Sequence, residues 1–139
     1  MAIPFYAKST GNEGFIKNME VVGFSNLNGV NAFQMALYKT ADGKYYMYCG
    51  SFRGPGWNIV DVTDPAHPTV VNWLEACDPK EFPATNTPKI QVADGLMIGA
   101  LGGGVPFLHG NKPGDKNKSG LMIFDIRQDP IHPKLLSFW

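Results

Sequence analysis

Apolar residues occur along this chain in short runs that glycine, proline, aspartate and asparagine separate. The runs are rich in β-branched and aromatic residues and are too short for a helix, which is the pattern of β-strands. No segment shows the 3.6-residue period of an amphipathic helix. We therefore predict eight strands: AFQMALYKT (32–40), KYYMYCGSF (44–52), WNIVDVT (57–63), PTVVNWLEA (68–76), TPKIQVA (87–93), LMIGALG (96–102), LMIFDIR (121–127) and KLLSFW (134–139).

The residues between the runs predict tight reversals of the chain. Ala-Asp-Gly occurs at 41–43 and again at 93–95, and an aspartate before a glycine that can take a positive φ favours a hairpin. The segments TDPAHP (63–68) and QDPIHP (128–133) contain prolines, which remove a ladder donor and end a strand. Neighbouring strands should therefore pair antiparallel.

The strands form a repeat. The stretch 56–73 returns as 120–139, with Ile59 matching Ile123 and Asp61 matching Asp125. The two Ala-Asp-Gly turns precede the two copies at similar distances, so each unit has four strands. Ahead of the first unit, residues 19–28 resemble the fourth strand of a further unit.

Four antiparallel strands joined only by turns make the blade of a β-propeller. We predict an all-β chain with an extension at 1–18 and a partial propeller at 19–139. The partial propeller comprises a lone strand at 19–28, one blade at 31–76 and a second at 87–139. A β-sandwich of about nine strands is the alternative.

The closing segments NIVDVTDPAHP and MIFDIRQDPIHP resemble the LVIVD repeat, a propeller blade motif, from about Met19 to Trp139. Members of that family are longer than this chain. The resemblance therefore implies an incomplete propeller whose partners are its remaining blades or further copies of the chain. The chain ends at LLSFW, inside apolar strand material, which favours a part of a longer protein over a self-assembling protomer.

Composition narrows the classes of partner and location. Twelve basic residues balance twelve acidic ones without a basic cluster, so we expect no nucleic-acid and no membrane partner. There is no signal peptide and no apolar stretch of about 18 residues, so we expect a soluble, cytoplasmic protein. Cys49 and Cys77 should be reduced, structural thiols.

In a blade, the first-to-second and third-to-fourth turns emerge at one end, and the other connections emerge at the opposite end. The long, uneven segments 25–31, 51–56, 76–88 and 102–119 therefore share one end, where ligands are commonly bound. Its candidate binding residues are Arg53, Asn86, His109 and Lys112.

His109 is the candidate catalytic residue, because an imidazole can act as base, acid or metal ligand near neutral pH. We expect no metal site, and His109 is the candidate ligand if one exists. Arg53 could hold a carboxylate or phosphate with its planar guanidinium. The repeated His67 and His132 are instead expected to bond turn backbone, and the repeated Asp61 and Asp125 to accept from backbone donors near the same turns.

Two functions remain open from the sequence. The first is a binding or interaction module that takes a small molecule or protein at the long-loop end. The alternative is an enzyme acting on a small metabolite over the propeller channel, with or without the assistance of a metal, with His109 and Arg53 in its site. The sequence points to no particular cofactor.

Overall fold

The computed structural model describes residues 20–104, 106 and 110–139, and these residues are all-β. The eight predicted strands are confirmed to within two residues at either end. Within the described residues, no helix is long and apolar enough to cross a membrane. The strands are β1 (Ala32–Lys39), β2 (Tyr45–Ser51), β3 (Gly56–Asp61), β4 (Thr69–Glu75), β5 (Thr85–Ala93), β6 (Leu96–Gly103), β7 (Gly120–Asp125) and β8 (Lys134–Phe138).

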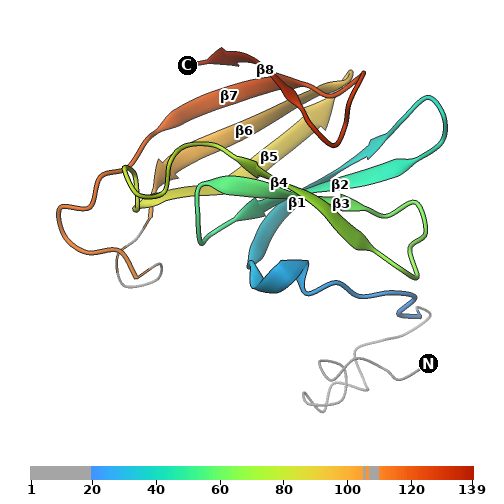
Figure 1. Cartoon of the computed structure of the whole chain (residues 1–139), viewed down its shortest axis with the longest axis horizontal. Coiled ribbons are helices and arrows are strands. Elements are labelled where there is room, and N and C mark those ends of the chain that lie inside the picture. Colours follow the sequence, from blue (N-terminus) through green and yellow to red (C-terminus); the bar gives the residue numbers. More distant parts are fainter. Residues whose placement is uncertain (1–19, 105, 107–109) are drawn as a thin grey trace.

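The strands form two antiparallel meanders, β1–β4 and β5–β8, which we call the first and second unit. The units join into one curled eight-stranded sheet at a single residue pair, Ser51 of β2 and Thr87 of β5. Figure 1 shows the two units splayed from this junction. Each unit is therefore a local, four-stranded sheet.

The hairpin turns follow from their residues. Asp94 and Gly95 both have positive φ values, 51° and 74°, and together make the two-residue reversal between β5 and β6. That backbone twist matches the twist of the flanking strands. Between β1 and β2 the loop is longer, and Gly43 takes the positive φ while Thr40 and Lys44 bond each other across the turn. Both hairpins predicted from Ala-Asp-Gly are confirmed.

The hydrophobic core lies between the two units. Side chains alternate along a strand, so each sheet has two distinct faces. The first unit buries Tyr46, Tyr48, Trp57 and Ile59, and the second buries Ile90, Met97, Phe124 and Ile126 against them. Trp57 lies directly on β6, because a Cβ at Gly99 would stand 2.2 Å from its Cζ2 atom. Its ring also meets that of Phe124 edge-on, with centroids 5.8 Å apart.

The units pack through faces that are not equivalent in the repeat. Ile59 is in the core, but its counterpart Ile123 lies on the far side of the second unit. Conversely, Phe124 is in the core, whereas its counterpart Val60 lies on the far side of the first unit. We call the face of Trp57 and Ile59 the front of the first unit; the front of the second carries their counterparts, Leu121 and Ile123. The front of the first unit therefore packs on the back of the second.

Two hydrogen bonds tie the first unit to the β7–β8 turn of the second. The hydroxyl of Tyr48 donates to the carbonyl of Pro130 at 2.8 Å, and Nδ2 of Asn72 donates to the carbonyl of Ile131 at 2.7 Å. Since Tyr48 is fully buried, its hydroxyl needs this partner. The repeated DPxHP segment thus serves as an acceptor surface for the preceding unit.

The segment expected as a lone strand at 19–28 differs from that prediction. In its described part, residues 20–26 form no strand and Leu27–Gly29 form a 3-10 turn. A strand requires a neighbour that exchanges backbone hydrogen bonds, and no described strand pairs with these residues. The extension at 1–18 lies outside the described residues. Gly23 nevertheless packs against the Pro65–Ala66 backbone, where a Cβ would stand 2.0 Å from the Pro65 carbonyl oxygen.

Candidate functional site

As the meander order requires, three connections lie at one end of the sheets, and they include the two longest between strands. They are the β2–β3 loop (52–55), the β4–β5 link (76–84) and the β6–β7 loop (104–119). Figure 1 shows the β6–β7 loop, in orange, on the side of the molecule opposite the cyan β1–β2 turn. We call this region the loop end.

The start of β5 holds the loop end together. Residues 84–87 are buried although three of them are polar. Thr87 Oγ1 accepts from the N–H of Gly56 at 3.0 Å, and Thr85 Oγ1 accepts from the N–H of Lys118 at 2.7 Å. The Ala84 backbone bonds both ends of the β6–β7 loop, accepting from the N–H of Gly104 and donating to the carbonyl of Lys116. Buried polar groups fixed in this way restrain the loops around them.

Asn86, a predicted binding residue, lies within this buried stretch. Its backbone bridges to Gly54, and its amide reaches two loops. In the orientation that matches donors to acceptors, Nδ2 donates to the Phe52 carbonyl at 2.5 Å and Oδ1 accepts from the Gly104 N–H at 3.1 Å. This position favours a role in holding the β2–β3 and β6–β7 loops together. A direct contact of Asn86 with a ligand stays a prediction.

Arg53 is exposed in the β2–β3 loop, and its backbone is fixed. Ser51 Oγ accepts from the Arg53 N–H at 3.0 Å and donates to the Arg53 carbonyl at 2.9 Å. The next residue, Gly54, has a φ of 107°, which a side chain would strain, and it bridges to Asn86. The guanidinium forms no ion pair with another described residue. Arg53 therefore presents a cation from an anchored loop.

Lys112 is also exposed at the loop end, in a small turn of the β6–β7 loop. Its N–H donates to Oδ2 of Asp115 at 2.7 Å, and its carbonyl accepts from the Asp115 N–H at 3.1 Å. Gly114 takes the positive φ of 90° that closes the turn. His109 lies outside the described residues, so its catalytic, binding and metal-ligand roles stay predictions.

The sequence reasoning did not identify the buried triplet Thr85-Asn86-Thr87 as the centre of this end. The signal was a run of three polar residues entering a strand pattern, which marks side chains that must find partners once buried. Lys118 was also missed. Its ammonium lies 4.8 Å from the ring centre of Phe138 and 6.0 Å from that of Phe82, so it brings β8 and the β4–β5 link together.

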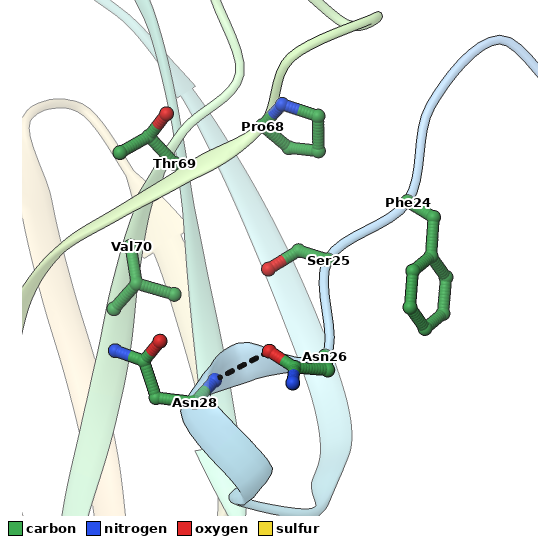
Figure 2. Close-up of a pocket in the computed structure, with 7 residues that line it drawn as sticks. All are labelled: Phe24, Ser25, Asn26, Asn28, Pro68, Thr69 and Val70. Atoms are coloured by element: carbon green, nitrogen blue, oxygen red, sulfur yellow. Dashed lines mark hydrogen bonds between the residues drawn. The ribbon is translucent and has the colours of Figure 1, made fainter. Parts of the chain in front are cut away.

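Two hollows lie beside the N-terminal segment, and neither is lined by Arg53, Asn86 or Lys112. The more polar hollow, of about 510 Å³, opens between residues 24–28 and the start of β4 (Figure 2). Asn26 Oδ1 accepts from the Asn28 N–H at 3.1 Å along its rim. The second hollow, of about 440 Å³, is an apolar groove on the back of the first unit. It is lined mainly by Phe24, Met35, Leu37, Met47, Val60 and Val62.

The repeated residues of the β3–β4 and β7–β8 turns form hydrogen bonds within their own turns. Thr63 donates its N–H to Asp61, and Arg127 donates its N–H to Asp125, as predicted. The prediction that the histidine rings bond turn backbone was wrong. Nδ1 of each ring instead faces the aspartate three residues earlier, at 2.8 Å for His67–Asp64 and 3.1 Å for His132–Asp129.

The carboxylates in these turns accept several hydrogen bonds. Those from the His67 ring and the Ala66 N–H lower the pKa of Asp64, and those from the His132 backbone and ring lower the pKa of Asp129. In the described parts of the chain, no group of three or more His, Cys, Asp or Glu side chains is placed to hold a metal ion. Cys49 and Cys77 are free thiols.

The chain matches no protein-family model, no curated protein and no solved structure. The resemblance of its repeat to the LVIVD motif therefore stays a prediction.

Proposed function

We propose that the two units are consecutive blades of a propeller of the LVIVD type, and that the chain is a binding module. Its loop end would take a small molecule or protein segment that carries a carboxylate or phosphate. The observation that carries this proposal is the exposed guanidinium of Arg53 on a loop whose backbone is held on both sides. The planar guanidinium of an arginine can form two parallel hydrogen bonds to such a group.

The packing of the units supports the propeller part of the proposal. Stacked repeats contact their neighbours through successive, non-equivalent faces, and this is the relation between the front of the first unit and the back of the second. In a sandwich of two sheets related by a two-fold axis, equivalent faces would meet instead. The two longest connections, the β4–β5 link and the β6–β7 loop, also lie at the same end of the units.

The rigidity of the loop end supports the binding part. Loops that select a ligand lose less entropy on binding when a scaffold already holds them in place. Here the first residues of β5 restrain both the loop of Arg53 and the loop of Lys112. The two cations would thus approach an anion from neighbouring loops.

An NMR titration of the ¹⁵N-labelled chain with a panel of small carboxylates and phosphates tests this proposal. We expect shift changes to cluster at 51–56, 76–84 and 104–119. We expect Arg53→Ala to weaken binding by about tenfold or more, corresponding to one lost charged hydrogen bond. Lys44→Ala removes an exposed cation from the opposite end and is the matched control. Shift changes confined to the β1–β2 and β3–β4 turns, or none with any compound, would refute it.

A further inference from the structure

The described residues contain three segments with the sequence pattern of a fourth strand but two sets of first three strands. Residues 20–25 (EVVGFS) align with 69–74 (TVVNWL) in β4 and with 134–139 (KLLSFW) at β8. Each segment has two adjacent aliphatic residues, followed by a small or polar residue and then by an aromatic one. Among the described strands, the two later segments each follow three strands of their own unit.

Residues 20–25 also occupy the place of a fourth strand relative to the unit that follows them. In β4, Asn72 contacts the β7–β8 turn by donating to the Ile131 carbonyl. Gly23, which aligns with Asn72, packs against Pro65 and Ala66 in the corresponding β3–β4 turn. The segment is therefore placed like a fourth strand although no described strand pairs with it.

The first unit beneath this segment has an open apolar back. Met35 and Leu37 are 57% and 56% exposed and line the 440 Å³ groove together with Met47 and Val60. The corresponding face of the second unit is closed, because the front of the first unit covers Phe124 and its neighbours. The groove is thus the equivalent surface of the first unit, and no described strand packs on it.

We propose that this groove and the free edge of residues 20–25 dock a three-stranded antiparallel β-sheet with an apolar front face and no fourth strand of its own. Residues 20–25 would pair with the third strand of that partner and complete it to four strands. The inference rests on the blade arrangement proposed above. It involves the back of the first unit, which faces away from the core, and none of the candidate binding residues.

A second intact copy of this chain does not fit the site. Its second unit offers the right front face, with Ile98 and Leu121 exposed, but its β8 already pairs with β7. That β8 would occupy the position of residues 20–25. Releasing β8 should therefore convert the second unit of one chain into a partner for the groove of another.

The test mixes two full-length chains. The acceptor is the wild-type chain. The donor carries Ser137→Pro, which disrupts β8 pairing, and Leu37→Asp, which places a charge on its own exposed groove and prevents self-assembly. Light scattering should give a 1:1 complex, with new amide-exchange protection in residues 20–25 of the acceptor. Leu135→Pro is a second way to release β8, and a donor that is unfolded alone should fold on the acceptor.

Matched controls locate the contact. Leu37→Asp in the acceptor should abolish the complex, whereas Leu121→Asp, on the exposed front of the acceptor's second unit, should leave it unchanged. A chain with Leu37→Asp and an intact β8 should not bind. The proposal is overturned if both donors fail to bind, if the intact-β8 chain binds equally well, or if Leu37→Asp in the acceptor has no effect. The titration at the loop end would be unaffected by these outcomes.

Discussion

At the scale of single residues, the junction between the units depends on buried hydrogen-bonding groups. Tyr48 is a clear case, since its ring fills the core while its hydroxyl reaches the Pro130 carbonyl of the other unit. Burial, and after it the neighbouring Tyr38, Tyr46 and Asp129, raise the pKa of this hydroxyl, so that it stays protonated and acts as a donor.

The Tyr48→Phe substitution should leave the fold intact and lower the free energy of unfolding by about 0.5–1.5 kcal/mol, because one hydrogen bond is lost without a change of packing. Chemical denaturation measures this change. Tyr45→Phe is the matched control, because Tyr45 is only half-buried and lies outside the core. Equal effects of the two substitutions would contradict the assigned role of the Tyr48 hydroxyl.

The ion pair of Asp125 and Arg127 predicts that the stability of the fold depends on pH. Hydrogen bonds from the Arg127 side chain and backbone lower the pKa of Asp125 to about 2. Because the folded pKa lies below the unfolded one, the stabilisation is present above pH 4 and is lost as the pH falls toward 2. Thermal unfolding between pH 7 and pH 2 should show a smaller loss for Asp125→Asn than for wild type. If wild type and Asp125→Asn lose stability equally between pH 7 and pH 2, the ion pair contributes nothing to stability.

Residue roles in the repeated turns could be predicted only in part. The backbone contacts of Asp61 and Asp125 follow from the known habit of aspartate beside a turn. The partner of His67 did not follow, because Asp64 offers a carboxylate oxygen at 2.8 Å only once the DPxHP turn has formed. Side-chain partners depend on backbone dihedrals that a residue pattern leaves open.

At the scale of elements, β6 is shaped by the side chain that crosses it. Gly99 occupies a buried strand position where other strands carry a side chain, and the indole of Trp57 fills the space. The glycine is therefore a packing requirement of the front-to-back contact rather than a turn residue. Its counterpart in the first unit, Met47, lies in the open groove and needs no such space.

Gly99→Ala should destabilise the chain by about 1–3 kcal/mol, because the added methyl overlaps the Trp57 ring and the core must shift. Gly102→Ala is the matched control in the same strand, since a Cβ there meets no atom within 4 Å. Differential scanning calorimetry of the two variants measures the difference. Similar unfolding temperatures for the two variants would contradict the packing of the Trp57 ring on Gly99.

The strands were predictable because apolar runs and turn residues determine them locally. The structure of residues 20–26 was not, because strand formation there depends on a neighbour that the sequence pattern of the segment does not specify. The loop end was predicted as a location. Its organisation around Thr85 and Thr87 was not, since partners 31 to 33 residues away become visible only in the folded chain.

At the scale of the whole molecule, one packing relation accounts for most of the structure. The front of the first unit covers the back of the second, which leaves an apolar groove on one side and an apolar front face on the other. Exposed apolar faces of this kind mark contact surfaces. The account therefore depends on which faces of the two units meet.

Contacts of the Trp57 indole, measured by nuclear Overhauser effects in solution, test that relation most directly. Front-to-back packing predicts signals between the Trp57 ring and the α-protons of Gly99 and the ring of Phe124. A sandwich with equivalent faces together would instead give signals from Trp57 to Ile98 and Leu121. The first result is the one we expect, and the second would contradict the account.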